Sequence, residues 1–311
     1  MAAGQGIVDA HHHVWDLAVR DQDWITGEEL APLRRDFTLD DLEPEARAVG
    51  VTATVLVQTV TVAEETPELL ALAARNELVA GVVGWTDLTA PGVADALAGL
   101  RELPGGEQLV GIRHQVQGEP DPGWLLRPDV RSGLASVAEA GLVYDLLVTP
   151  HQLAAAHEAA LRLPGCTFVL DHLGKPPIAS GELHPWADAV RLLASLPNTV
   201  CKLSGMVTEA DRPWSVNDLK PYADTVLDAF GPERLMFGSD WPVCRLAATY
   251  AEVGGAAGEL MAGLSPAERR EVFAGTALRT YGLPLHGNSP RVQPSSSPAS
   301  TTRCSRAPVG R

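Results

Sequence analysis

Three consecutive histidines close a short apolar stretch near the start of the chain. They are His11, His12 and His13, and they follow Ile7-Val8-Asp9-Ala10. In a strand, side chains alternate between two faces, so His11 and His13 share one face and His12 takes the other. Two imidazoles on one face can bind a metal ion or polarise an oxygen. Taken alone, the stretch also fits a purification-tag fragment or a histidine-rich surface turn.

Ionisable, amide and hydroxyl side chains also stand at the ends of other apolar stretches. A charged group in such a place costs free energy if it is buried without a partner. Any one of them could simply anchor a loop through a salt bridge. Together they indicate a catalytic or binding site, because perturbed ionisable groups gather in such sites. These residues are Gln58, Asp87, Arg113, His114, Asp145, Asp171, His172, Lys202, Ser204, Ser239 and Asp240.

The apolar stretches alternate with helical patterns over most of the chain. The stretch 51–58 is rich in β-branched residues, which is typical of a parallel strand buried on both faces. Strict alternation of strand and helix indicates a parallel sheet, and about eight units predict a closed (β/α)8 TIM barrel of the α/β class. After the opening strand, the expected strands are 51–58, 79–85, 109–116, 142–148, 167–172, 199–204 and 234–240. The expected helices are 38–50, 64–76, 92–100, 128–140, 151–161, 186–196 and 217–230, with closing helices from 246 and 265.

The competing fold is an open, doubly wound parallel sheet. Its dinucleotide-binding form carries a GxGxxG motif after an early strand, and no such motif occurs here. We therefore expect the barrel, and we expect no nucleotide cofactor.

Composition limits the class of partner. The chain has 311 residues, 45% of them hydrophobic, and a net charge of -15. This charge argues against nucleic acid and anionic membranes as partners and leaves a small-molecule substrate. The four cysteines form no CxxC pair, no leader-like segment precedes the first strand, and no apolar run is long enough to cross a bilayer, so a cytoplasmic protein with reduced thiols is expected. A homo-oligomer is compatible with the sequence.

The end of the chain differs from the rest. Residues 1–284 are expected to form the single barrel domain, whereas residues 285–311 are rich in serine, proline and arginine and contain no acidic residue. Such a segment cannot bury enough apolar surface to offset the loss of conformational entropy, so we expect a disordered tail.

In a (β/α)8 barrel, the active site lies at the C-terminal ends of the strands. His11, His13, His172 and Asp240 can then converge on the barrel axis. Alternation of faces allows only one member of a neighbouring pair to face that axis, so we expect either Asp171 or His172 to do so, but not both.

The same alternation applies to Arg113 and His114. His114 is therefore either a substrate contact or a histidine packed against the helix layer. Lys202 either hydrogen-bonds the substrate or forms a salt bridge with Asp171 or Asp145.

Five motifs in this order resemble the amidohydrolase superfamily. The resemblance is to the amidohydrolase-related branch of lactonases that act on sugar lactones, such as fuconolactonase and rhamnonolactonase, and it runs from about Ile7 to Leu283. A pair of histidines alone is weak evidence for this branch, but the five motifs together, in this order, are specific to it. They are Val8-Asp-Ala-His-His-His-Val-Trp-Asp16, Gly111-Ile-Arg-His114, Asp171-His-Leu-Gly-Lys-Pro176, Cys201-Lys-Leu-Ser-Gly205 and Phe237-Gly-Ser-Asp-Trp-Pro-Val243.

The resemblance implies a metal-binding group. Members with two metal ions have a carboxylated lysine on the fourth strand and a histidine on the fifth. Here those strands carry Arg113-His114 and Asp145, which argues against two metal ions. One divalent ion, with Zn²⁺ as the first choice, and a metal-independent site both stay open. The implied metal-binding residues are His11, His13, His172 and Asp240.

The implied reaction is hydrolysis of a sugar lactone to its aldonic acid, a step of carbohydrate catabolism. Asp240 would take a proton from the attacking water and return it to the leaving alkoxide. The implied catalytic residues beside it are His172, Arg113 and Lys202. The expected substrate contacts are Trp15, His114 and Trp241, since aromatic faces suit the C–H faces of a sugar, with loop packing as the alternative for the tryptophans.

Three other functions stay open on the sequence. Related amidohydrolases decarboxylate aromatic acids, and Arg113 could hold the carboxylate of such a substrate. A lactone derived from an aromatic dicarboxylate would need several arginines near the barrel mouth, and the loops contain few. The third alternative is a binding protein that has the same barrel but has lost its catalytic activity. The presence of His11, His13, His172 and Asp240 argues against it, because such a protein would not need all four.

Overall fold

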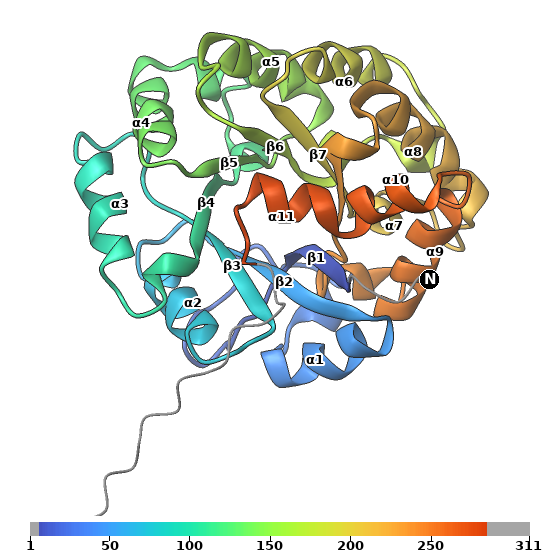
Figure 1. Ribbon diagram of the computed structural model, residues 1–311, viewed down its shortest axis with the longest axis horizontal. Helices are drawn as coiled ribbons and strands as arrows, with labels where there is room; N and C mark the ends of the chain where they lie inside the picture. Colours follow the sequence, from blue (N-terminus) through green and yellow to red (C-terminus); the bar gives the residue numbers. More distant parts are fainter. Residues whose placement is uncertain (1–5, 285–311) are drawn as a thin grey trace, which may run out of the picture.

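The structure is a computed structural model that describes residues 6–284 and forms one eight-stranded barrel (Figure 1). The strands lie in sequence order, and all seven pairings between consecutive strands are parallel. The expected (β/α)8 barrel is confirmed. The strands are β1 (Ile7–His12), β2 (Val51–Val57), β3 (Val79–Gly84), β4 (Leu109–His114), β5 (Val143–Leu146), β6 (Phe168–Leu170), β7 (Thr199–Leu203) and β8 (Leu235–Phe237). The expected tail at 285–311 lies outside the described residues.

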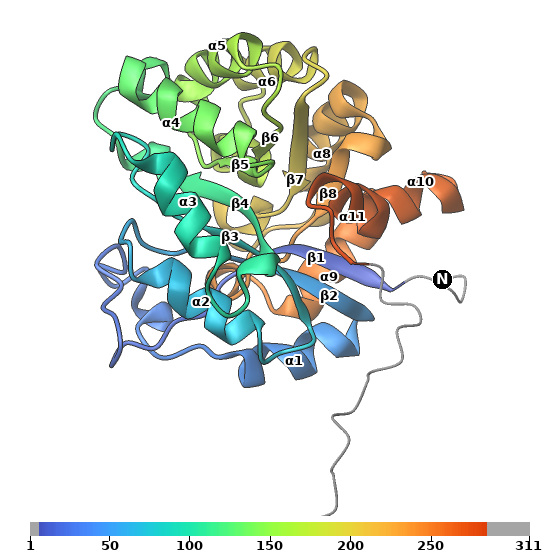
Figure 2. The ribbon, with the colours of Figure 1, turned by 60° about the vertical axis from the view of Figure 1, so that its left-hand side comes forward.

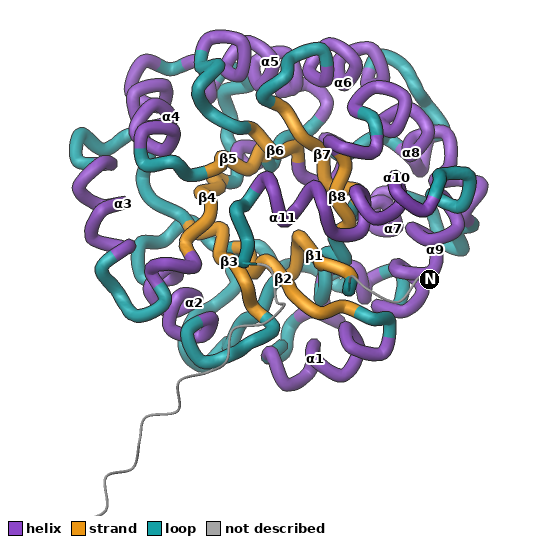
Figure 3. The backbone as a smooth tube through the Cα atoms, viewed as in Figure 1, coloured by secondary structure: helices purple, strands orange, loops and turns teal. Residues whose placement is uncertain are grey.

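Helices surround the strands as an outer layer, which Figures 2 and 3 show most clearly. Several begin with a capping box, in which a serine or threonine and an acidic residue satisfy free N–H groups; the expected Thr38–Asp41 pair is one of them. In the part of the chain that the structure describes, no helix is long and apolar enough to cross a membrane. The helices are α1 (Leu39–Ala48), α2 (Glu65–Ala73), α3 (Val93–Arg101), α4 (Pro128–Glu139), α5 (Leu153–Arg162), α6 (Trp186–Ala194), α7 (Met206–Glu209), α8 (Val216–Phe230), α9 (Tyr250–Leu260), α10 (Pro266–Arg270) and α11 (Thr276–Thr280).

Two apolar clusters hold the barrel together. The larger lies between the strands and the outer helices, and the smaller fills the barrel interior with short or β-branched side chains such as Val55, Val169 and Val200. Helix α11 crosses the end of the barrel that faces the reader in Figure 1 and adds Ala277 to the interior cluster, and Tyr281, directly after the helix, joins it. The interior is therefore a packed core that supports the strand ends opposite α11.

The barrel closes through the segment after β8 rather than through a long ladder. The Asp240 N–H donates to the His11 carbonyl at 2.8 Å, and the His13 N–H donates to the Trp241 carbonyl at 2.7 Å. These two bonds join the last and first strands at the level of the candidate site.

Strands β6 and β8 are shorter than the sequence suggests. β6 ends at Leu170, and His172 and Lys175 in the turn that follows have positive φ values of 50° and 53°. β8 ends at Phe237, and Asp240 has a φ of 57°. Left-handed backbone is costly for residues other than glycine and is found mostly where the surrounding structure enforces it, often at functional sites.

Candidate active site

A β-bulge in β1 aims the histidines. The pairing with β2 passes from Asp9–Thr54 to His12–Leu56, so β1 contains one extra residue at this point. Ala10 can therefore pack in the barrel interior while His11 and His13 also turn toward the axis. His12 points the other way, and its Nε2 lies 2.9 Å from the Thr54 hydroxyl. The expected division of the three histidines between two faces is confirmed.

Three imidazoles and one carboxylate meet at the end of the barrel. The Nε2 atoms of His11 and His13 are 3.1 Å apart. Asp240 Oδ1 lies 3.8 Å from His11 Nε2, 3.6 Å from His13 Nε2 and 3.9 Å from His172 Nε2. All four residues are buried. The structure thus brings together the four residues expected to converge.

Each imidazole has a neighbour at Nδ1, which leaves Nε2 directed at Asp240. His13 Nδ1 lies 2.8 Å from the Val57 carbonyl, so that nitrogen donates. His172 Nδ1 lies 2.9 Å from the Ser204 hydroxyl, and His11 Nδ1 lies 3.3 Å from an Asp171 oxygen. Such partners fix the tautomer and the ring orientation of a metal-binding histidine.

The protonation states of His11, His172 and Asp240 suit metal binding. Burial lowers the pKa of His172 to about 4. Burial also lowers the pKa of His11 to well below its ordinary value, and Lys202 adds to the effect. Burial alone would raise the pKa of Asp240, but His172 and His13 outweigh it, and that pKa is lowered. At neutral pH, the neutral imidazoles of His11 and His172 therefore face an ionised carboxylate.

The geometry fits a divalent metal ion. Zinc bonds of about 2.0–2.1 Å in a tetrahedral arrangement place ligand atoms roughly 3.3 Å apart, close to the 3.1–3.9 Å separations found here. Two groups of three residues have ligand atoms within 4.8 Å of one another: His11, His13 and Asp240, and also His11, Asp171 and His172. One cation competes for the same space, because Arg113 Nη1 lies 3.3 Å from His11 Nε2.

Asp171 and His172 both face this group, so the expectation that only one of them could do so is wrong. Alternation fails because β6 ends at Leu170, and His172 has a left-handed conformation. Asp171 accepts from Arg113 Nη1 at 2.9 Å and forms an ion pair with Lys202 Nζ at 3.0 Å. His172 packs its ring against His11 with centroids 4.4 Å apart.

Lys202 lies beneath the imidazoles and has no exposed surface. Its Nζ contacts Asp145, forms an ion pair with Asp171 and lies 3.1 Å from His11 Nδ1. The Tyr281 hydroxyl, from beyond α11, donates to the same Asp145 carboxylate at 2.9 Å. Lys202 therefore forms salt bridges, which is the second of the two alternatives for this residue, and does not line the cavity. It contacts the site through His11 and Asp171.

Asp9 connects the bulge to the last strand. Its carboxylate is fully buried and accepts from the His11 N–H at 3.1 Å, from the Ser239 hydroxyl at 2.6 Å and from the Tyr250 hydroxyl at 2.7 Å. Ser239, the residue before Asp240, is therefore hydrogen-bonded to Asp9, the residue at which the bulge begins.

A cavity of about 310 Å³ opens above the four residues. His13, Arg113, His172 and Asp240 form its floor, and side chains from the segments that follow seven of the eight strands form its walls. These wall residues are Trp24, Leu30, Thr59, Gln115, Gln117, Leu147, Lys175, Thr208, Glu209, Val243 and Leu246.

The three expected substrate contacts do not line this cavity. Trp241 is fully buried and packs edge-on against Phe37. Trp15 donates to the Arg35 carbonyl and lies on the other side of the first loop. His114 stacks on Trp124 with centroids 4.2 Å apart, which is the packing alternative for that histidine.

Sequence reasoning missed the tryptophan that does line the cavity. Trp24 belongs to the long loop after β1 and donates to Gln22. Lys175 and Glu209 were missed as well; they form a 3.0 Å ion pair on the wall. The signal was available, since loops that follow the strands of a barrel form its mouth, but nothing in a loop sequence indicates which side chains turn inward.

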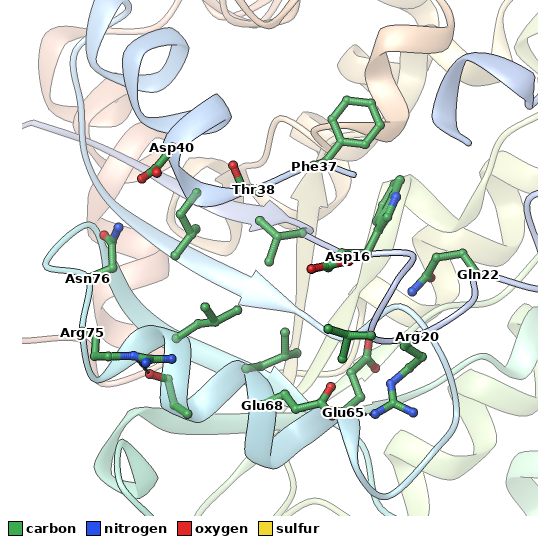
Figure 4. Close-up of a pocket in the computed structure, with 17 residues that line it drawn as sticks. Asp16, Arg20, Gln22, Phe37, Thr38, Asp40, Glu65, Glu68, Arg75 and Asn76 are labelled. Carbon is green, nitrogen blue, oxygen red and sulfur yellow. Dashed lines mark hydrogen bonds and ion pairs between the residues drawn. The ribbon is translucent and has the colours of Figure 1, made fainter. Parts of the chain in front are cut away.

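A second cavity lies outside the barrel, between the first loop, the start of α1 and helix α2 (Figure 4). Its volume is about 560 Å³, larger than that of the first. Its rim carries Asp16, Asp40 and Arg75, and Arg20 pairs with Glu68 at 2.7 Å. None of the clustered imidazoles lines it, so the smaller cavity is the candidate active site.

Comparison with known proteins agrees with this geometry. The sequence model of the amidohydrolase family matches residues 8–283, and the chain belongs to that family. An L-fucono-1,5-lactonase of Burkholderia multivorans is 42% identical over 289 residues, covering 89% of this chain and 96% of the relative. One from Burkholderia ambifaria is 40% identical over 280 residues, with 89% and 95% covered.

Solved structures show the same fold. The crystal structure of a Burkholderia multivorans amidohydrolase with bound zinc superposes with a TM-score of 0.84 at 42% identity, and covers 90% of this chain and all of that one. Zinc is thus bound in a relative whose whole chain matches 90% of this one.

Proposed function

We infer that this protein is a hydrolase that opens a sugar lactone to its aldonic acid, and we propose L-fucono-1,5-lactone as the first substrate to test. The two relatives at 42% and 40% identity carry that activity in their names and match nearly the whole chain. The sugar-lactonase activity expected from the five motifs is supported by both.

The observation that best supports this proposal is the pairing of the charged side chains that line the cavity. Its two permanent cations are already neutralised: Arg113 pairs with Asp171 at 2.9 Å and Lys175 pairs with Glu209 at 3.0 Å. The remaining polar wall offers hydroxyl and amide groups, from Thr59, Gln115, Gln117 and Thr208. Such a wall suits a neutral molecule with many hydroxyl groups.

The chain's own residues supply the parts of an ester hydrolysis. Asp240 Oδ1 accepts a proton as water attacks the lactone carbonyl, and the same carboxyl group returns it to the ring oxygen when the C–O bond breaks. His13 and His172 flank Asp240, whose pKa is lowered from its ordinary value, so its carboxylate is ionised at neutral pH. Arg113 lies at the cavity floor and, through its 2.9 Å pair with Asp171, holds that carboxylate beside His11.

We propose that His11, His13, His172 and Asp240 hold one divalent ion, with Zn²⁺ as the first choice. When bound, such an ion would polarise the carbonyl and lower the pKa of water. Support comes from the closeness of the ligand atoms of His11, His13 and Asp240, from the contacts that orient the His13 and His172 rings and from the zinc-bound relative.

The alternative functions find less support. A decarboxylase or a hydrolase of aromatic dicarboxylate lactones must bind a substrate carboxylate, and both permanent cations among the cavity residues already have carboxylate partners. A decayed binding protein would have lost the buried group of ionisable residues, which is costly to maintain without a use.

The test is lactone hydrolysis by the purified protein, followed with a pH indicator against a panel of aldonolactones. Acid release from L-fucono-1,5-lactone well above the spontaneous rate is expected. Metal analysis of the same sample, before and after dialysis against a chelator, reports on the ion independently of activity. Absence of hydrolysis across the panel would contradict the proposed function.

A further inference from the structure

The turn that follows β2 contributes to the wall of the catalytic cavity. It consists of Gln58, Thr59 and Val60, and we call it the β2 turn. All three residues are buried, and Thr59 lines the cavity. The Gln58 N–H donates to the carbonyl of Val83 in β3 at 2.9 Å. The N–H groups of Thr59 and Val60 need partners elsewhere, because a buried N–H without a partner is costly.

Glu65 binds both of these N–H groups from outside the catalytic cavity. It is the first residue of α2, it is buried, and it lines the second cavity rather than the first (Figure 4). The Thr59 N–H donates to Glu65 Oε1 at 2.8 Å, and the Val60 N–H donates to Oε2 at 3.1 Å. Burial raises the pKa of Glu65, and the hydrogen bonds from Thr59 and Val60 oppose that rise. One carboxylate thus holds the β2 turn.

The side chain of Thr59 is bound to the same carboxylate. Its hydroxyl donates to Glu65 Oε1. A hydroxyl has one proton and two lone pairs, whereas a carboxylate can only accept. Because Glu65 takes the proton, the Thr59 oxygen can offer only lone pairs to another molecule. No group among residues 6–284 donates to this oxygen.

The β2 turn also contacts the floor of the cavity, through Arg113. Gln58 Oε1 accepts from Arg113 Nε at 3.1 Å and from Nη2 at 2.9 Å, and the Gln58 carbonyl accepts from Nη2 as well. The same guanidinium forms the 2.9 Å pair with Asp171. A shift of the turn would therefore alter the wall at Thr59 and the floor at Arg113 together.

We propose that Glu65 is a positioning residue of the lactonase site, although it does not line the catalytic cavity. It holds the β2 turn in place and leaves the Thr59 oxygen as an acceptor for a hydroxyl group of the substrate. The inference rests on the proposed lactonase function and adds a residue that acts on substrate binding through its neighbours. A sugar lactone suits such an acceptor, because each of its hydroxyl groups can donate a hydrogen bond.

The first experiment measures KM and kcat of Glu65→Gln for L-fucono-1,5-lactone. Glutamine keeps the size of the side chain but replaces one oxygen with an NH2 group, which faces a backbone N–H of the β2 turn in either orientation. The turn must then shift, and KM should rise by about 10-fold. The value of kcat should change less, because Asp240 keeps its contacts with the imidazoles.

Glu68→Gln is the matched control. Glu68 lies on the same helix and lines the same second cavity, but it pairs with Arg20 at the surface, so KM and kcat should stay at their wild-type values. Metal content and denaturant unfolding are measured on both variants. A rise in KM at unchanged metal content, in folded protein, reports positioning, whereas a general loss of structure would lower kcat and metal content together.

Variants of Thr59 test whether Glu65 acts through the hydroxyl, and they do so even if Glu65→Gln fails to fold. Thr59→Val removes the hydroxyl and keeps the shape, so KM should rise, whereas Thr59→Ser keeps the hydroxyl and should retain a KM near the wild-type value. Residues in one hydrogen-bond network couple. In the Thr59→Val background, Glu65→Gln should therefore raise KM by a factor at least about threefold smaller than it does alone.

Four results would overturn the inference and leave the lactonase function intact. They are a wild-type KM for folded Glu65→Gln, an equal rise in KM for Glu68→Gln, a wild-type KM for Thr59→Val, and full additivity in the double variant. Absence of lactone hydrolysis by the wild-type protein would instead contradict the proposed function, and the inference with it.

Discussion

Gly205 offers a sharp test of how the site is positioned, because it is packed directly against His172. The residue has a φ of 67° and a ψ of 0°, at the turn between β7 and α7. A Cβ at this position would lie 2.6 Å from His172 Nδ1 and 2.8 Å from His172 Cβ. These distances are too short for any real contact, so Gly205→Ala must displace the histidine ring.

The size of the effect follows from the contacts. Ordinary van der Waals contact needs about 3.4 Å or more, so the ring has to move by roughly 0.8 Å. This displacement breaks the 2.9 Å contact between His172 Nδ1 and Ser204 and moves Nε2 relative to Asp240. A misplacement of about 1 Å can cost on the order of 100-fold in rate, and we expect kcat to fall by 10- to 100-fold.

Gly181→Ala is the matched control. Gly181 has almost the same backbone conformation, with a φ of 69° and a ψ of 7°, but a Cβ there would meet nothing within 4 Å. Both variants pay the left-handed backbone cost of about 1–2 kcal/mol. Denaturant unfolding measures that shared cost, and the initial rate of lactone hydrolysis measures the displacement of His172.

The reasoning fails if Gly205→Ala loses stability only as much as Gly181→Ala and keeps the wild-type kcat. That result would mean that the turn can relax away from His172 without moving the ring. A fall in kcat for Gly181→Ala would equally refute it, because that glycine touches nothing at the site.

Four further predictions follow from contacts described above. Asp240→Asn should lower kcat by about 10²–10⁴-fold with the circular dichroism spectrum unchanged; full turnover would sink the proposed mechanism. Ser204→Ala should weaken metal binding by about 10- to 100-fold, measured by competition with a chromogenic chelator, and an unchanged affinity would remove Ser204 as the partner that orients His172. Lys202→Met should destabilise the fold by about 3–5 kcal/mol in denaturant unfolding, since it leaves two buried carboxylates without their ammonium; a loss below about 1 kcal/mol would show that Arg113 and Tyr281 suffice. The buried thiols should resist alkylation at pH 8, because burial raises the pKa of Cys166 to about 12 and raises those of Cys201 and Cys244; peptide mapping of rapidly alkylated native protein would contradict this if these three were labelled.

Much of the fold could be predicted because its signals are local. Apolar runs alternate with helical patterns, and the strand at 51–58 and the capped helix from Thr38 are both present in the structure. The convergence of His11, His13, His172 and Asp240 also follows from topology alone, since parallel strands end on one side of a barrel.

The exceptions come from backbone geometry that the sequence does not encode in a simple period. Alternation cannot anticipate the bulge that lets Ala10 and His11 both turn inward, nor the left-handed conformation that brings His172 beside Asp171. The same limit explains the tryptophans: Trp241 follows the last motif directly but is fully buried, whereas Trp24, in an unremarkable loop, lines the cavity.

Closure of the barrel has a consequence for biosynthesis. The hydrogen bonds that join the first strand to the segment after the last, His13 to Trp241 and Asp240 to His11, also bring the base to the imidazoles. A nascent chain therefore cannot assemble this site until the segment around Trp241 has left the ribosome, however early its first strand forms. Acquisition of activity would then report completion of the whole barrel, and two fragments cut within an outer loop should regain activity only when they associate.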